Sequence, residues 1–108
     1  MSNPPSRILL EGDVGVRDAA RLAEQFSQAI AGPLTIDCTS LSGVDLAVIQ
    51  VLLAADRTAR AAGQSLTLIH PPGGPLQQLL VATGFIAADG TPLTPDGPLW
   101  AAAEAHAA

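Results

Sequence analysis

The segment LTIDCTSLSGVD, residues 34–45, joins a short apolar run to the clearest helical pattern in the chain. The apolar segment 34–38 is short and lies between two helical patterns, which is typical of a strand buried between helices. The small polar residues of 39–44 predict a loop. Asp45 then stands where a helix N-cap is expected, because its carboxylate can accept hydrogen bonds from the free N–H groups of a first helical turn.

The apolar residues after Asp45 recur at helical spacing and predict a helix over 45–62. Its apolar stripe consists of Leu46, Ile49, Leu52 and Leu53. Gly63 follows the last periodic residue and is typical of a helix C-terminus.

Further patterns place the remaining elements along the chain. They predict a strand over 8–10, a short second strand near Val14, a helix over 16–31, a strand over 65–70, a helix over 76–83 and a last helix over 99–107. Strands that are separated by helices favour parallel pairing and right-handed crossovers. We therefore expect an α/β fold with a small, mixed or mainly parallel sheet and helices packed on it.

Length and composition limit the classes of protein that fit. The 108 residues suffice for one domain, which we expect over 7–108, after a disordered tail over 1–6 and with a turn-rich region plus a short helix over 87–108. Hydrophobic residues make up 48% and charged residues 14%, which excludes extended disorder. The net charge of −5 offers no basic stripe for nucleic acid.

The expected location is the cytoplasm. No apolar stretch approaches the 18 or so residues that span a membrane. The N-terminal residues lack the charged and apolar regions of a signal peptide. The lone Cys38 cannot form an internal disulfide bond and suits a reducing compartment.

No active site can be assembled from the titratable residues. Cys38 has no neighbouring base in the sequence, although His70 could approach it in the fold, and a catalytic thiol needs such a base. His70 and His106 have no partner at metal-ligand spacing. Asp37 and Asp45 flank one predicted loop, where a strand-end turn and a helix cap are their ordinary roles. We expect no catalytic residue, metal or cofactor.

The segment from Asp37 to Asp45 resembles the STAS domain, which anti-sigma factor antagonists share with sulfate transporter tails. That family has one Asp at the end of a central strand and another eight residues later, at the start of its main helix. The elements that follow match in order, and the resemblance covers roughly residues 7–86. It implies a non-enzymatic module that docks a protein partner through the start of the helix at Asp45.

Leu46 departs from the family pattern. In the phosphorylated antagonists a serine follows the second Asp and is modified by a partner kinase, whereas Leu46 has no hydroxyl group. The family's phosphoswitch cannot operate at this position, so constitutive docking is the first hypothesis. Thr39, Ser40 and Ser42 are the candidates for a displaced phosphosite.

The resemblance also implies a docking surface and partner classes. The surface consists of Ser40, Ser42, Gly43, Asp45, Leu46, Ile49 and Gln50. The partner classes in a bacterial regulatory system are an anti-sigma kinase, a stressosome-type scaffold or a chemotaxis-associated protein. One alternative is a stand-alone subunit that binds the ATPase of a lipid-transport ABC complex. Another is a small-ligand or nucleotide sensor, in which the turn at 12–15 and the loop at 72–75 offer backbone N–H groups to an anion.

Overall fold

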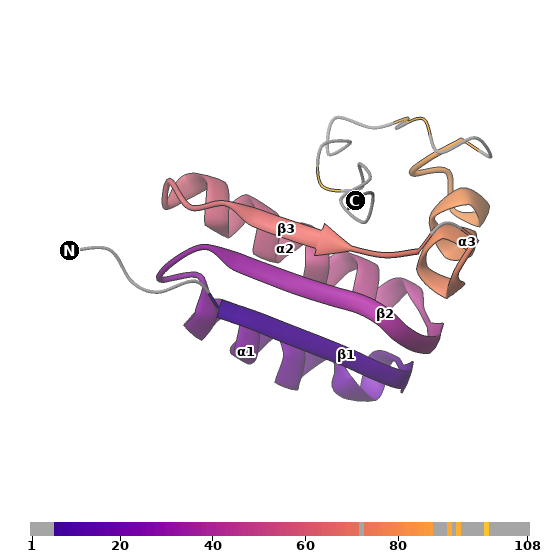
Figure 1. Cartoon of the computed structure of the whole chain (residues 1–108), viewed down its shortest axis with the longest axis horizontal. Helices are drawn as coiled ribbons and strands as arrows, with labels where there is room; N and C mark the ends of the chain where they lie inside the picture. Colours follow the sequence, from indigo (N-terminus) through magenta and orange to yellow (C-terminus); the bar gives the residue numbers. More distant parts are fainter. Residues whose placement is uncertain (1–5, 72, 88–90, 92, 94–98, 100–108) are drawn as a thin grey trace.

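A computed structural model describes residues 6–71, 73–87, 91, 93 and 99. Strands and helices alternate along the chain (Figure 1). They are β1 (Ser6–Val14), the 3-10 turn η1 (Val16–Asp18), α1 (Ala19–Ala29), β2 (Leu34–Val44), α2 (Leu46–Ala61), β3 (Leu66–Ile69) and α3 (Pro75–Ala82). The α/β fold in one compact domain is therefore confirmed.

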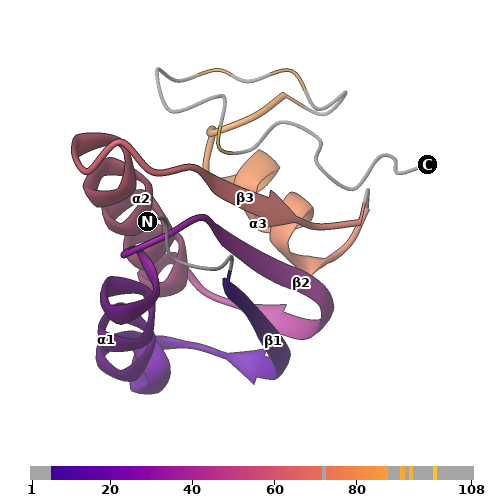
Figure 2. The same ribbon diagram turned by 60° about the vertical axis from the view of Figure 1, so that its left-hand side comes forward.

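The described sheet has three parallel strands in the order β1-β2-β3. Ile8, Ile36 and Leu68 lie side by side across the strands. Figure 2 shows that α1 and α2 cover one face of this sheet, while α3 follows β3. Parallel pairing results from the helical crossovers between consecutive strands, as the alternation of patterns predicts.

The core between the sheet and the helices is almost entirely aliphatic. Its fully buried large side chains are Leu22, Phe26, Leu34, Ile36, Val48, Ile49, Leu52, Leu68, Leu76, Leu80 and Ile86. Leu99 is also buried, whereas the rest of the expected helix over 99–107 lies outside the described residues. Residues 1–5 of the expected tail lie outside them too, and Ser6 already belongs to β1.

The predicted loop over 39–44 is wrong, because β2 continues through it to Val44. The separate strand near Val14 is wrong for the same reason, since β1 runs unbroken from Ser6 to Val14 and pairs with β2 to its end. Two register shifts interrupt the pairing, and at each of them β2 has one residue more than β1. Such bulges break the alternation of buried and exposed side chains that indicates a strand.

The helix ends follow the predicted signals closely. Asp45 caps α2, and Gly63 after its C-terminus has a φ of +73°, a left-handed conformation that glycine adopts without strain. Pro75 is the first residue of α3. The expected helix over 16–31 divides instead into η1 and α1 and ends at Ala29.

Candidate functional site

The Asp45 carboxylate connects two parts of the chain at the start of α2. Its Oδ1 accepts a hydrogen bond from the Val48 amide at 3.3 Å, and its Oδ2 accepts one from the Val16 amide at 2.9 Å. Asp45 thus caps α2 and also holds the first residue of η1 against it. Gly15 allows this approach, because a Cβ at that position would lie 2.8 Å from Oδ2 of Asp45.

Two large apolar side chains are exposed on either side of this link. Val16 is 68% exposed and Leu46 is 44% exposed. The Val16 backbone amide bonds the Asp45 carboxylate, and Leu46 directly follows Asp45 in the chain. Val16 and Leu46 therefore flank the same carboxylate. The sequence pattern does not single out Val16, because it predicts that this residue begins a helix.

An acidic hollow adjoins the apolar pair. It has a volume of about 390 Å³ and is lined by Asp13, Gly15, Val16, Arg17, Asp18 and Asp45. Hydrogen bonds from the Arg21 guanidinium and from the Gly15 amide hold the pKa of Asp18 below its ordinary value. Asp18 is therefore ionised at neutral pH and forms an ion pair with Arg21 beside Val16.

Most of the expected docking residues reach the surface. Ser40, Ser42, Leu46 and Gln50 are exposed, while Gly43 and Asp45 are half-buried. Gly43 lies so close to β1 that a Cβ there would approach Oδ1 of Asp13 to 2.7 Å.

Ile49 is the exception among these residues. Its side chain is 0% exposed because it packs into the core on the sheet side of α2. A partner cannot reach it, so we remove Ile49 from the expected surface. We define the docking surface as Val16, Asp45, Leu46 and Gln50, together with the neighbouring Ser40, Ser42 and Gly43.

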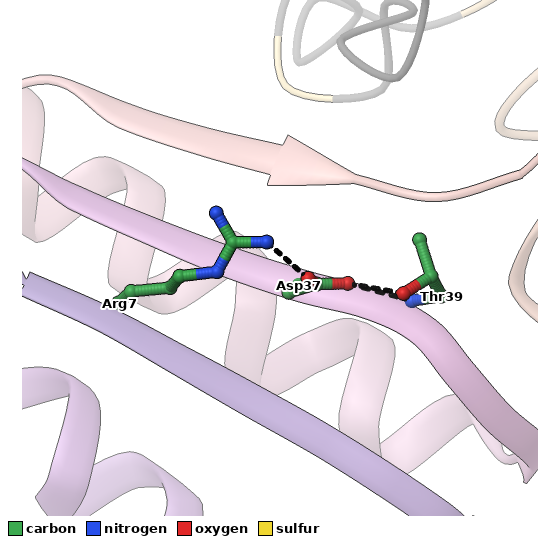
Figure 3. Close-up of polar contacts among 3 residues, drawn as sticks. All are labelled: Arg7, Asp37 and Thr39. Atoms are coloured by element: carbon green, nitrogen blue, oxygen red, sulfur yellow. Dashed lines mark hydrogen bonds and ion pairs between the residues drawn. The ribbon is translucent and has the colours of Figure 1, made fainter.

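Asp37 lies in a separate polar network on β2 (Figure 3). Its Oδ1 accepts hydrogen bonds from the Thr39 hydroxyl at 2.6 Å and from the Thr39 amide at 2.9 Å. Its Oδ2 pairs with the Arg7 guanidinium on β1. The hydroxyl, then the amide and then Arg7 hold the pKa of Asp37 below its ordinary value. Asp37 and Asp45 are therefore not brought together, since each serves its own network.

The candidate phosphosites differ in how far their hydroxyl groups are engaged. The Thr39 hydroxyl donates to Asp37, whereas the Ser40 and Ser42 side chains are exposed on β2. A kinase would therefore have direct access to Ser40 and Ser42.

Cys38 and His70 do not form a reactive pair on the surface. Both are buried, with exposures of 1% and 3%. Burial, helped by the nearby Asp37, raises the pKa of the Cys38 thiol to about 12, so the thiol stays protonated and is a poor nucleophile. In the described part of the chain, no group of three His, Cys, Asp or Glu side chains is placed to hold a metal ion.

The two glycine-containing turns offer few amides to an anion. The Gly15 amide donates to Asp18 and the Val16 amide to Asp45. In the second turn, the Gly73 amide donates to Gln77, and the Gly74 amide donates to the Pro71 carbonyl. Internal acceptors therefore occupy the N–H groups of Gly15, Gly73 and Gly74 in these two segments.

Within the described residues, no helix has both the length and the apolar character needed to cross a membrane. The family model described as "Mlab, STAS domain" matches residues 2–87 of the chain. The match includes β1, β2, β3 and all of the helices named above.

Proposed function

This chain belongs to the STAS domain family, whose members are generally non-enzymatic protein-interaction modules, and we propose that it docks a partner protein through the docking surface at the start of α2. Docking is constitutive in this proposal, because Leu46 occupies the position where the phosphorylated antagonists have a serine. The protein acts in the cytoplasm of a bacterial cell.

The exposure of Val16 and Leu46 is the observation that carries the proposal. Large hydrophobic side chains exposed by a third or more of their area are few among the described residues: Leu9, Val16, Leu46 and Leu93. Two of them, Val16 and Leu46, flank Asp45, the N-cap of α2. Burying an exposed aliphatic side chain in an interface contributes about 1.5–3 kcal/mol at most, so such a pair is a suitable centre for a protein contact.

The acidic hollow supports a particular partner chemistry. Asp13, Asp18 and Asp45 line the hollow beside Val16 together with Arg17, and Arg21 pairs with Asp18, so the three carboxylates outnumber the two guanidinium groups by one. A partner with apolar side chains at the centre of its interface and Arg or Lys at the rim would complement this surface. An anti-sigma kinase, a stressosome-type scaffold, a chemotaxis-associated protein and the ATPase of a lipid-transport ABC complex are the partner classes to be tested.

The experiment compares three tagged forms of the protein in lysate of the native cell. Wild type, Leu46→Glu and Thr58→Glu are used for affinity capture, and the retained proteins are identified by mass spectrometry. Thr58 is the matched control, because it is exposed on the same helix but lies away from the docking surface. The retained protein is then purified, and its Kd for each form is measured by biolayer interferometry.

We expect Leu46→Glu to weaken binding by tenfold or more, because it places a charge at the apolar centre of the contact. Thr58→Glu should bind like wild type, and both variants should unfold at the wild-type urea midpoint. Equal affinity of wild type and Leu46→Glu would refute the proposed surface. Phosphate on Ser40 or Ser42 of the captured wild type, found by intact mass, would refute constitutive docking.

A further inference from the structure

β1 forms an open edge of the described sheet. The strand order is β1-β2-β3, and no other described strand pairs with the outer side of β1 (Figure 1). A hollow of about 240 Å³ lies along this side, lined by residues 8–11 and Val14 of β1 and by Arg21 and Gln25 of α1. Among the described residues, nothing pairs with this edge, which another strand could therefore join.

The outward backbone groups of β1 can be assigned from one hydrogen bond. The Ser6 amide donates to the Pro33 carbonyl at 2.9 Å and thus faces β2. Because backbone groups of alternate residues in a strand face opposite sides, Arg7, Leu9 and Glu11 direct their N–H and C=O groups to the open edge. Gly12, with a φ of +73°, interrupts the regular extended backbone after these residues, although β1 continues to Val14.

The side chains of the same three residues are exposed. Along the strand they are basic, apolar and acidic in turn. Charged residues on an edge strand usually discourage pairing with another chain. Here an antiparallel, two-fold symmetric pairing centred on Leu9 would place Arg7 of each copy opposite Glu11 of the other. The contact would then contain two such oppositely charged pairs. Leu9, which is 49% exposed, would face its own symmetry mate. The edge is therefore complementary to itself in charge and in apolar contact.

We propose that two copies of this chain associate through their β1 edges, in antiparallel register about Leu9, and form one continuous sheet that includes the three described strands of each copy. Arg7 also pairs with Asp37 on β2, on the other side of β1, so its contact with Glu11 of the second copy would use another of its five N–H donors. A contact between two short strands buries less than the roughly 1,000 Å² of a stable interface, so the dimer is weak and transient. This proposal is independent of the docking surface at α2.

The first test follows association by sedimentation equilibrium from about 10 µM to about 1 mM protein. Wild type should shift from monomer to dimer within this range. Glu11→Arg should dimerise about tenfold more weakly, because two attractive cross-strand pairs become repulsive. Glu24→Arg makes the same charge change at an exposed position of α1 and should behave like wild type. The urea midpoints of the variants show whether the fold is intact.

The second test locates the contact by disulfide cross-linking. Leu9→Cys should form a covalent dimer rapidly under mild oxidation, because directly opposed residues have Cα atoms about 5.5 Å apart, within disulfide range. Val16→Cys is more exposed but lies outside the pairing, so it should cross-link at a rate set by random collision. The native Cys38 is buried with a raised pKa and does not compete.

Three outcomes would overturn the proposal. If wild type stays monomeric at about 1 mM, two copies do not pair, and the edge would instead bind a strand from another protein. A dimer that Glu11→Arg does not weaken would have a different interface. Leu9→Cys that cross-links no faster than Val16→Cys would exclude the register about Leu9.

Discussion

The Val16 amide donates a hydrogen bond to Oδ2 of Asp45 at 2.9 Å, although 29 residues separate the two in the sequence. The same carboxylate caps α2 through the Val48 amide. One side chain therefore fixes the start of η1 and the start of α2 relative to each other. The exposed side chains of Val16 and Leu46 take their positions from this link.

Replacement of Asp45 by alanine should lower the free energy of unfolding by about 1–2 kcal/mol, because α2 loses its N-cap and the Val16 amide loses its acceptor. Asp45→Asn should cost less, since its amide oxygen still accepts one hydrogen bond. Urea denaturation followed by circular dichroism measures both values. Asp13→Ala is the control, because the nearby Asp13 carboxylate is exposed. A loss in Asp45→Ala no larger than the control's would contradict the role of the link.

Replacement of Val16 by serine should weaken partner binding about three- to tenfold, because it removes apolar area from the docking surface. Its effect on stability should stay within about 0.5 kcal/mol, since the side chain is mostly exposed. Leu9→Ser removes a comparable exposed side chain from the β1 edge and should leave partner binding unchanged. Biolayer interferometry against the captured partner gives the Kd values. Equal losses in the two variants would show that the effect is not specific to this surface.

The Asp37 network should make stability fall at acid pH. The pKa of Asp37 lies below its ordinary value of 3.8 in the folded state, because Thr39 and Arg7 stabilise the carboxylate. This contribution is complete above the unfolded-state pKa and is lost as pH falls through the folded-state pKa. Urea midpoints of wild type and Asp37→Asn, measured from about pH 6 to about pH 2, should therefore converge at the acid end. A constant difference across that range would contradict this account.

The Cys38 thiol should be almost unreactive in the folded protein. With a pKa of about 12, it is a thiolate in only about one molecule in 10⁴ at pH 8, and burial limits access further. A disulfide reagent such as Ellman's reagent should react slowly in buffer and completely in about 6 M guanidinium chloride. Cys38→Ala should keep full partner binding. Rapid reaction of the native thiol, or loss of function in Cys38→Ala, would reopen the enzyme hypothesis.

Local signals predicted the elements whose ends depend on single residues. Asp45 as the cap of α2, Gly63 after it and Pro75 at the start of α3 all occupy the expected places. Each of these residues acts through its own side chain or φ angle, so its role can be read without knowledge of the fold. The α/β architecture followed from the alternation of strand and helix patterns.

The continuation of β2 and the exposed Val16 depended on contacts that the sequence does not display. Four of the residues in 39–44 are small, as in a loop, and the segment stays extended because β1 pairs with it across two bulges. Bulges move side chains out of alternation, so Thr39 and Ser40 are both exposed. Val16 is exposed because η1 precedes α1 and is held to Asp45, a contact 29 residues away.

The leucine at position 46 also determines where control of such an interaction would reside in the cell. Without a chemical switch at the contact, occupancy follows mass action and is set by the Kd and by the amounts of the two proteins. Under the proposed constitutive docking, regulation would fall to synthesis and degradation and would be only as fast as protein turnover. A loss of 1–2 kcal/mol in stability can change cellular abundance several-fold, so substitutions far from α2 would alter signalling through copy number alone.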